Sequence, residues 1–576
     1  MESVNCTLFY VIIDKVMNMK HIFILKPNTS KELISCIVSL FSCDNGLEKF
    51  PLDSPSDSNF LSTQAEMEMA IQGAYATLKT TQGYSFPSVI LMECLSDNGW
   101  ERAEQSWITA GNGQHDSNNS LMSSFWSQYY LGIGRCNFII ENMIRGKENT
   151  SEDIYNRILA EAKFIRAFHY FWLTELFGDV PFPTKPITRI EETQMAKTDK
   201  AEIVDYLLKE LNEAASILPV EISDKELGRA SKGAALALRA KIALHNQQWD
   251  EAIQSSLEVM ELGYALAENY ESLFKNGEQQ KTKEVIFSLQ YLYQYSTYGP
   301  NGITTRMAKG YSSKIPTQAL IDSYECIDGL SIDKSPLYNP QKPFENRDPR
   351  LGYTCVVPGS VFGGYQFESH KDSIECWNYN TNPATRVANQ DALNAYATFS
   401  GYCWRKYAEW SQNDPTVGET PIILLRYADV LLMYAEAKIE ANKIDASVYD
   451  AINLVRQRVG MPVIDGGKTQ EQLRSVIRKE RRYELAFEGS RRFDIIRWKI
   501  AEQVMSGNLY GRIPKGLLSS APKIDEWGTP SYDNVANKSE MRVIEMRKFN
   551  KDRDYLFPIP RLEIETNKLL IQNPNY

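Results

Sequence analysis

Three segments of the chain place aromatic rings beside amide, carboxylate or guanidinium groups. They are SDNGWER at 96–102, the polar stretch at 291–298 and ECWNY at 375–379. An aromatic ring can cover the patch of axial C–H groups on one face of a pyranose, while polar side chains bond the hydroxyls at its edge. The candidate ligand-binding residues are Asn98, Trp100, Tyr291, Tyr293, Tyr295 and Trp377.

The three tyrosines alternate along the sequence. In a strand, Tyr291, Tyr293 and Tyr295 would share one side. Each candidate aromatic has an alternative interpretation, which is packing beneath a loop. Because a large helical core uses aromatic residues equally well, their abundance does not decide between the two.

A second set of residues has the spacing of a catalytic carboxylate group. Glu480, Glu484 and Glu488 lie four residues apart and share one helix face, with Arg481 and Arg482 beside them. A glycosidase needs two facing carboxyl groups, one with a raised pKa, whereas neighbouring arginines favour the ionised form. We therefore interpret this segment as an ion-pair network at a helix junction.

Motifs of the commoner enzyme classes are absent from the sequence. The five histidines form neither an HExxH pair nor another zinc spacing, and His169 is interpreted as a core residue. Neither a phosphate loop nor Gly-x-Ser-x-Gly occurs. The net charge of −10 argues against general nucleic-acid binding. We predict no catalytic residue, no metal and no cofactor.

Apolar periodicity predicts the helices that must position these segments. The clearest signal is AEAKFIRAFHYFWLTELFGDVPFP at 160–183, a helix that is apolar nearly all round and so must be buried on several sides. Gly178 ends it, and the prolines that follow prevent its resumption. Helices are predicted over 63–79, 121–145, 152–177, 199–217, 229–246, 249–262, 421–442, 446–459, 470–488 and 490–504.

Two predicted helix pairs are self-similar. The first joins an alanine-rich helix to WDEAI at 249–253, and the second joins LLMYAEAKIEA at 431–441 to YDAINLV at 449–455. Small residues allow close helix approach, and the pattern resembles the tetratricopeptide unit. Since neither pair can bury its apolar face alone, we expect the pairs to stack.

The predicted fold class is mainly α, a tetratricopeptide-like scaffold of helical hairpins with long loop-rich insertions containing a few short strands. One domain spans 63–576. The helical scaffold occupies about 63–79, 121–262 and 421–504, and a carboxyl-terminal segment occupies 505–576. The loop-rich regions at about 80–120 and 263–420 are too long to be mere connections, so we expect them to bind the ligand.

The amino terminus reads as a lipoprotein signal. Lysines precede a short apolar run, and LFSC at 40–43 looks like a bacterial lipobox. We expect lipidation at Cys43, a signal peptide over 1–42 whose true start is Met19, and a Pro-rich lipidated tether over 43–62. The alternative is an ordinary buried helix. The six later cysteines are predicted to be buried apolar residues rather than a disulfide framework.

Four motifs resemble the SusD/RagB family, surface glycan-binding lipoproteins of Bacteroidetes-type bacteria. They occur in the family's order and cover nearly the whole mature chain. The motifs are the stretch at 160–183, ILLRYADVLLMYAEA at 423–437, IRKERRYELAFEGSRRFDIIRW at 477–498, and the carboxyl end from YLFPIPRLEI at 555–564 to NPNY at 573–576.

The resemblance implies a non-enzymatic protein anchored by lipid at the outer face of the outer membrane. It implies capture of oligosaccharides and their transfer to a SusC-like TonB-dependent transporter. Three alternatives stay open: a glycan-active hydrolase, a purely structural tetratricopeptide scaffold, and a SusD-like protein that captures another nutrient such as peptide.

Overall fold

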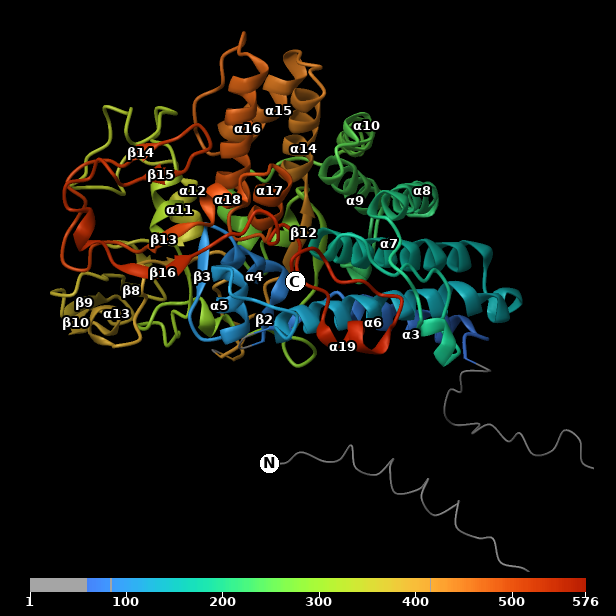
Figure 1. Cartoon of the computed structure of the whole chain (residues 1–576). Coiled ribbons are helices and arrows are strands. Elements are labelled where there is room, and N and C mark those ends of the chain that lie inside the picture. The colour runs from blue at the N-terminus through green and yellow to red at the C-terminus, as the bar shows by residue number, and fades with distance from the viewer. Residues whose placement is uncertain (1–59, 83–84, 415) are drawn as a thin grey trace, which may run out of the picture. The chain divides into compact units, whose positions relative to one another are not determined.

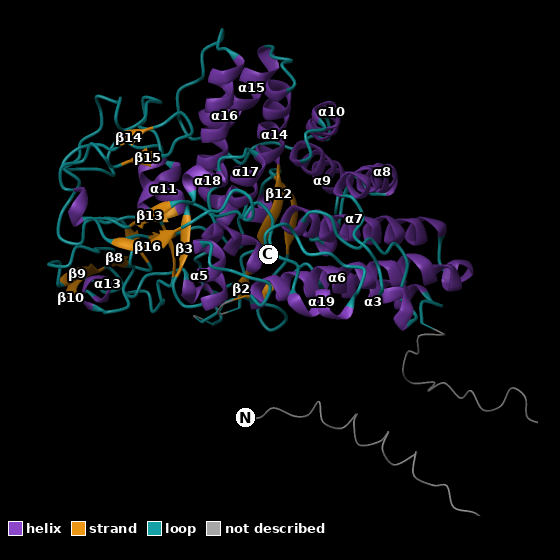
Figure 2. Ribbon diagram, viewed as in Figure 1, coloured by secondary structure: helices purple, strands orange, loops and turns teal. Residues whose placement is uncertain are grey.

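The computed structural model describes residues 60–82, 85–414 and 416–576. Leu61–Tyr576 forms one compact unit that is mainly helical, with short strands among its loops (Figures 1 and 2). The predicted signal segment, Cys43 and nearly all of the predicted tether lie outside the described residues. None of the described helices has both the length and the apolar composition of a membrane span.

The scaffold helices lie where apolar periodicity predicts them. They are α3 (Gln64–Ala76), α6 (Ser120–Asn142), α7 (Glu152–Phe177), α8 (Lys200–Ile217), α9 (Lys232–His245), α10 (Trp249–Met260), α14 (Tyr427–Glu440), α15 (Ala446–Arg458), α16 (Gln470–Leu485) and α17 (Arg491–Arg497). Helix α7 is buried along its carboxyl-terminal half, as its sequence predicts, and it ends at Gly178, whose φ is +75°. Its His169 is a buried core residue, with Nε2 2.8 Å from the hydroxyl of Thr77.

Neighbouring helices pack in chain order, α6 on α7, α7 on α8, α8 on α9 and α9 on α10. Helix α10 also packs against α14, which in turn contacts α15 and α16 (Figure 1). Leu431, Ile452 and Ile477 form part of the buried core between these helices, and Ile253 and Leu257 of α10 pack against it. The hairpins α9–α10 and α14–α15 therefore stack, which confirms the tetratricopeptide-like scaffold.

Short antiparallel strand pairs connect distant segments. The pairs are β1 (Thr81–Gln82) with β2 (Phe86–Pro87), β3 (Gly99–Glu101) with β5 (Lys314–Pro316), β4 (Val285–Leu289) with β12 (Ile422–Arg426), β6 (Cys355–Val356) with β11 (Cys403–Trp404), β13 (Gly507–Tyr510) with β16 (Val543–Arg547), and β14 (Lys523–Ile524) with β15 (Pro530–Ser531). A four-stranded sheet holds β7 (Val361–Phe362), β8 (Tyr365–Gln366), β9 (Glu375–Asn378) and β10 (Thr385–Ala388).

The structure corrects two predicted helices. The segment predicted over 421–442 starts as β12 because Ile422–Arg426 pairs with β4, and helix α14 begins only at Tyr427. The helix predicted over 490–504 is broken between α17 and α18 (Ala501–Val504), where Lys499 has a φ of +57°. Periodicity also missed the short helices α4 (Ser88–Leu91), α5 (Gln105–Asn112), α11 (Gln318–Ser323), α12 (Arg350–Thr354), α13 (Gln390–Leu393) and α19 (Arg561–Thr566).

Glu484 of α16 is the centre of a buried ion-pair network. Its carboxylate lies 3.1 Å from Arg350 Nη1 and 2.6 Å from Arg426 Nη1, and it also pairs with Arg458. Burial alone would raise the pKa of Glu484, but the charges of Arg458, Arg426 and Arg350 outweigh burial and hold that pKa below its usual range. Glu484 is thus permanently ionised near neutral pH and cannot serve as a general acid.

The two companion carboxylates are paired in the same way. Glu480 lies 2.6 Å from Arg350 and 2.8 Å from Arg456, and Glu488 lies 2.7 Å from Lys406. The predicted ion-pair network is confirmed, with two corrections. Glu488 lies beyond the end of α16, and the cations come from outside the motif because the loop-rich region and α15 pack against it.

The arginines inside the motif face other partners. Arg481 pairs with Asp429 at 2.9 Å and Asp494 at 3.1 Å, whereas Arg482 pairs with Asp97 at 2.9 Å. The six cysteines after Cys43 are all buried and free of disulfide bonds, as predicted. The interior of the scaffold therefore combines apolar packing with a set of buried ion pairs.

Candidate functional site

Asn98 and Trp100, two of the predicted ligand-binding residues, lie in the protein interior. The Asn98 amide donates to Glu93 Oε1 at 2.6 Å and accepts from Arg482 Nε at 2.8 Å. Trp100 lies in β3, is 7% exposed and stacks on Phe399 with ring centroids 5.7 Å apart. The expectation that these two side chains are exposed is wrong, because Asn98 is bonded to buried side chains and Trp100 packs against Ile315, Leu509 and Phe399.

The tyrosine segment is a tight turn rather than a strand. Strand β4 ends at Leu289, and Leu292 and Ser296 exchange backbone hydrogen bonds of 2.9 and 3.0 Å. Gln294 in this turn has a φ of +72°. The alternation therefore does not place the three tyrosines on one side, and the prediction of a shared strand face is wrong.

Each tyrosine of the turn has a different environment. Tyr291 is buried, with the ammonium of Lys79 4.8 Å from its ring centroid. Tyr293 is half-buried, and its backbone N–H donates to Glu419 at 3.0 Å. Tyr295 is 84% exposed and is the one of the three that presents its ring to solvent.

Two adjoining cavities lie beside this turn, and together we call them the Tyr295 groove. One, of about 620 Å³, is lined by residues that include Gln72 and Lys79 from the region of α3, Lys225, Gln290 and Tyr295. The other has a volume of about 400 Å³. Leu227, Gly228, Arg229, Ser288 and Gln290 line both. These volumes are in the range of sites that bind small ligands.

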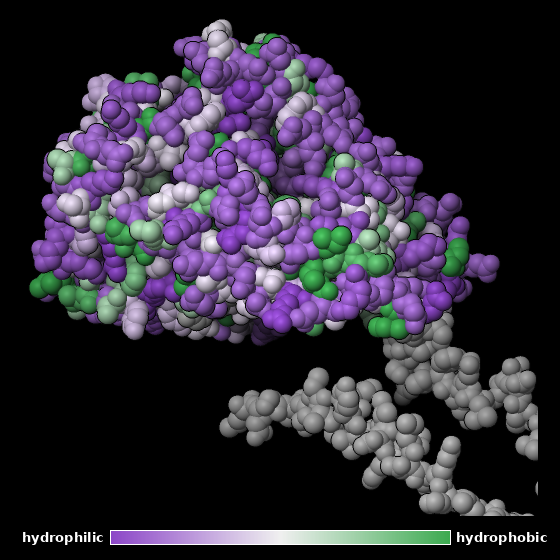
Figure 3. All heavy atoms as spheres, in the orientation of Figure 1, coloured by the Kyte–Doolittle hydropathy of each residue, from purple (hydrophilic) through white to green (hydrophobic). Residues whose placement is uncertain are grey.

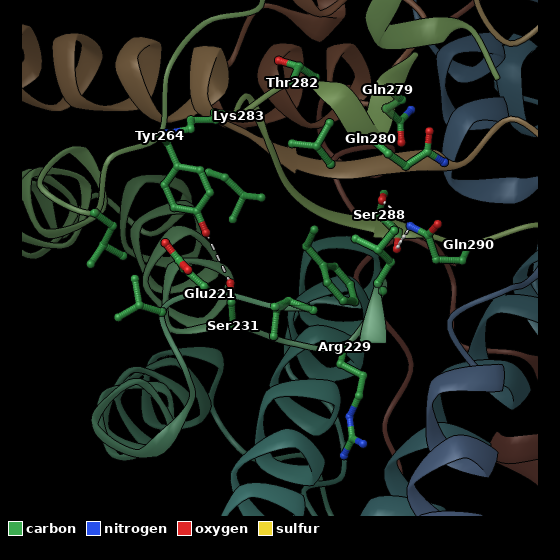
Figure 4. A pocket seen from close by; sticks show the side chains of 18 of the residues that line it. Glu221, Arg229, Ser231, Tyr264, Gln279, Gln280, Thr282, Lys283, Ser288 and Gln290 are labelled. Atoms are coloured by element: carbon green, nitrogen blue, oxygen red, sulfur yellow. Dashed lines mark hydrogen bonds between the residues drawn. The ribbon is translucent and has the colours of Figure 1, made fainter. Parts of the chain in front are cut away.

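Figure 4 shows the second cavity, whose polar walls come from separate elements. Tyr264 lies between α10 and β4, and its hydroxyl is 3.3 Å from that of Ser231 at the start of α9. Across the cavity, Gln290 Nε2 donates to the hydroxyl of Ser288 at 2.8 Å. Such amide and hydroxyl groups can exchange these bonds for bonds to ligand hydroxyls.

Gly228 fixes the width of the groove where the two cavities meet. It has a φ of +89°, and a Cβ there would lie 2.7 Å from the Gln290 side chain. The neighbouring Arg229 has a structural role, because its guanidinium pairs with Glu161 at 2.9 Å and with Glu68 at 3.1 Å. The backbone thus approaches Gln290 closely at a position that glycine suits.

The carboxylates that line the groove are Glu221 and Glu226. A hydrogen bond from Ser223, with smaller contributions from Arg157 and Arg229, lowers the pKa of Glu226 below its usual value despite slight burial. A glycosidase acid needs the opposite shift. The groove geometry suits reversible capture of a polar ligand.

Trp377 lies apart from the groove, in β9 of the four-stranded sheet. It is 39% exposed, and the guanidinium of Arg386 on the neighbouring strand β10 lies 5.2 Å from its ring centroid. The described residues that line the two cavities include neither Trp377 nor Asn98 nor Trp100. Ligand contact by the six candidate residues stays a prediction, which the burial of Asn98, Trp100 and Tyr291 disfavours and the exposure of Tyr295 and Trp377 permits.

Sequence reasoning missed the polar groups of the groove because they lie on or next to scaffold helices. Gln72 and Tyr264 belong to no motif, and Gln290 stands between the apolar strand at 285–289 and the tyrosines that begin at 291. A usable signal was Gly228, which lies just before Arg-Ala-Ser and the N-cap Ser231 of helix α9 and can mark a close backbone approach.

Two family models together match nearly all of the described chain. The model described as the SusD family matches residues 271–576, more than half of the sequence. The chain belongs to the SusD family. A second model, described as starch-binding associating with outer membrane, matches residues 49–244. This confirms the resemblance seen in the four motifs.

Individual SusD-family relatives align over most of their length. The chain is 26% identical to SusD-like protein P2 of Formosa agariphila, over 94% of this chain and 98% of that one. It is 23% identical to the starch-binding protein SusD of Bacteroides thetaiotaomicron, over 78% of each. A solved SusD-like carbohydrate-binding protein from Bacteroides fragilis superposes with a TM-score of 0.77 and 30% identity, covering 89% of this chain and 100% of that one.

Proposed function

We propose that this SusD-family chain is a non-enzymatic glycan-binding protein that captures oligosaccharides in the Tyr295 groove. The observation that carries the proposal is the open, polar-walled groove beside an exposed aromatic ring in a member of this family. Tyr295 would stack on a sugar ring, and Gln72, Lys225 and Gln290 would bond its hydroxyls. The name of the similar Bacteroides fragilis protein, a carbohydrate-binding one, supports this ligand class.

The same proposal includes lipidation of Cys43 and anchoring at the outer face of the outer membrane. Its partner would be a SusC-like TonB-dependent transporter that receives the captured oligosaccharide. The family model whose description names outer-membrane association supports this location. Moderate affinity is expected, since a ligand that is delivered must also leave.

Binding is tested with a soluble form that begins at Asp44 and so retains every described residue. Affinity electrophoresis and calorimetry against a panel of oligosaccharides should identify a ligand whose chain length is unchanged after prolonged incubation. Tyr295→Ala should then weaken binding about tenfold, in keeping with loss of one stacked aromatic ring. Leu569→Ala, also at an exposed apolar side chain, is the matched control and should leave affinity unchanged.

The alternatives predict different results. A hydrolase would shorten the oligosaccharide in the absence of any other protein, and a peptide-binding member would ignore the panel but bind peptides. A purely structural scaffold would bind neither. Transfer is tested by copurification of the full chain with the transporter from outer membranes, and Cys43→Ala should release the chain from that fraction.

A further inference from the structure

An apolar pocket lies between helices α6 and α19, and none of its described lining residues lines the Tyr295 groove. Its volume is about 270 Å³, which suits one long side chain better than an extended ligand. Because Glu563 of α19 lines it, we call it the Glu563 pocket. Its aromatic and apolar wall residues include Trp126, Tyr130, Pro181, Ile187, Met195 and Leu570.

Hydrogen bonds within the chain hold the walls of this pocket together. The hydroxyl of Tyr130 donates to the carbonyl of Pro181 at 2.7 Å. Gln194 Nε2 donates to the last carbonyl of α19 at 3.0 Å, and the Asn567 side chain donates to the carbonyl of Met195 at 2.7 Å. Because these bonds form without a ligand, little further ordering is needed when one binds.

Exposed apolar side chains form a rim around the Glu563 pocket. They are Ile187, Ile190, Leu562, Leu569 and Ile571. Each of them lines the pocket or lies within two residues of one that does, and Ile190 and Ile571 are 76% and 73% exposed. At the place of α19 in Figure 1, the space-filling view of Figure 3 shows apolar residues gathered on the surface. A gathering of this kind is typical of a surface that contacts another molecule.

The carboxylate of Glu563 is half-buried among these apolar walls. Burial raises its pKa, and a hydrogen bond from the Trp126 side chain opposes this shift without cancelling it. Arg189 and Arg561 are close in sequence to the lining residues, but they pair with other glutamates at 2.9 and 2.6 Å. Within the described ranges, Glu563 itself forms no salt bridge. The pocket therefore holds a carboxylate without a counter-charge.

This combination of groups favours one class of ligand. A neutral apolar group or a lipid chain would remove water from Glu563 and leave it uncompensated, which costs free energy. A guanidinium or an ammonium group would supply the missing charge and donate hydrogen bonds to the carboxylate. The aliphatic stem of an arginine or lysine side chain can lie along apolar walls, and aromatic rings also attract its cation.

We propose that the Glu563 pocket binds an arginine or lysine side chain of a partner protein, while apolar residues next to that cation pack on the rim. The carboxylate selects the cation, and the exposed side chains of Ile190, Leu562 and Ile571 supply the contact area around it. This inference goes beyond the proposed glycan-binding function and does not depend on it, because it concerns a protein contact at a separate surface.

The test uses the form that begins at Asp44 and short peptides that differ at one position. Each probe is acetyl-Ser-Leu-X-Leu-Ser-amide, in which X is arginine, lysine or citrulline. Citrulline has nearly the shape of arginine but carries no charge. Titration calorimetry should show that the arginine or the lysine peptide binds at least tenfold more tightly than the citrulline peptide. The comparison between arginine and lysine shows which cation the pocket fits better.

Substitutions locate the binding site. Glu563→Gln should abolish the preference for the charged peptides and change the affinity of the citrulline peptide by less than twofold. The matched control Glu565→Gln removes an exposed carboxylate from the same helix and should keep the preference. Ile571→Ser should weaken binding of all three peptides about threefold, whereas Ile144→Ser, at another exposed isoleucine, should not. Near-ultraviolet circular dichroism checks that each variant is folded.

Equal binding of the charged and citrulline peptides would overturn the inference, as would a charge preference that Glu563→Gln retains. An equal loss in Glu565→Gln would report only net charge and would also refute it. Flotation with phosphatidylethanolamine–phosphatidylcholine vesicles tests a lipid surface as the occupant instead. If the vesicles bind, Ile571→Ser releases them and none of the peptides binds, the rim is a lipid-contact surface and the inference is wrong.

Discussion

Arg426 Nη1 lies 2.6 Å from Glu484 Oε1, and both side chains are almost completely buried. Arg426 ends β12 and Glu484 lies in α16, so this pair joins the second and third sequence motifs across 58 residues. Taking two charges out of water is costly unless both are fully paired. The two motifs therefore depend on each other for their place in the interior.

Glu484→Gln should destabilise the protein by about 3–5 kcal/mol, because it leaves Arg350, Arg426 and Arg458 without their common counter-charge. Urea unfolding followed by circular dichroism measures the change. Glu565→Gln breaks an exposed pair and should alter stability by less than about 1 kcal/mol. A loss of stability in Glu484→Gln that is as small as in Glu565→Gln would contradict the central role of this carboxylate.

Glu93 should make stability fall as pH rises. Burial raises the pKa of Glu93 to about 7, with hydrogen bonds from Asn98 and the backbone of Phe487 opposing it. Since the folded-state pKa lies above the ordinary value of 4.5, the carboxyl favours folding fully below pH 4.5, and this contribution is lost as pH rises towards 7. At pH 8 the charged form should cost about 3 kcal/mol.

Glu93→Gln isolates this effect from the other titrating groups. The stability difference between wild type and variant should shift in favour of the variant between pH 4.5 and pH 8, measured by urea unfolding at each pH. Asp97, whose pKa is about 2 because Arg482 and Arg491 outweigh its burial, titrates below this window. Parallel pH profiles for the two proteins would show that Glu93 does not titrate as described.

Trp100→Ala should cost about 3–5 kcal/mol of stability, because it removes a large buried ring from between β5 and Phe399. Trp100→Phe keeps part of this packing and should cost less. Both variants should keep affinity for a neutral oligosaccharide within twofold, as titration calorimetry can measure. Selective loss of ligand binding in a fully stable Trp100→Ala protein would restore Trp100 to the binding site.

Gly489→Ala should destabilise the turn between α16 and α17 by more than about 1 kcal/mol. Gly489 has a φ of +78°, and a Cβ there would lie 2.1 Å from the backbone oxygen of Val89. The melting temperature should fall accordingly. Gly460→Ala is the matched control: its φ is +75° but a Cβ would meet no atom within 4 Å, so only the backbone strain applies. If both substitutions lower the melting temperature equally, the contact between the new Cβ and Val89 does not contribute to the destabilisation.

The sequence predicts those parts of the fold whose cause is local. Helix α7 was predicted with its observed bounds because a long apolar run and a terminal glycine are signals within one segment. Residues 422–426 were assigned to a helix because their strand conformation depends on β4, more than 130 residues earlier. Arg350 likewise pairs with Glu480 and Glu484, but it comes from a loop-rich region whose sequence has no periodicity that could predict this contact.

The site was harder to predict for the same reason. A tryptophan flanked by polar residues has the same sequence pattern whether its ring is exposed or buried. Trp100 is buried where β3 pairs with β5, a strand that lies some 200 residues further along the chain. The exposed ring of Tyr295 was among the candidates, but the polar walls of its groove belong to helices and loops that only the folded chain brings together. Residue type indicated the chemistry, and tertiary contacts decided which residues present it.

The turn that carries Tyr295 closes on itself, because Leu292 and Ser296 exchange both of their backbone hydrogen bonds. Its conformation therefore depends little on which side chains occupy the tip. The tip residues of such a turn can be exchanged while the charged interior and the stacked hairpins stay as they are, and under the proposed function this exchange would change which oligosaccharide the groove binds. Transplanting residues 292–296 between relatives would then move selectivity without redesigning the host.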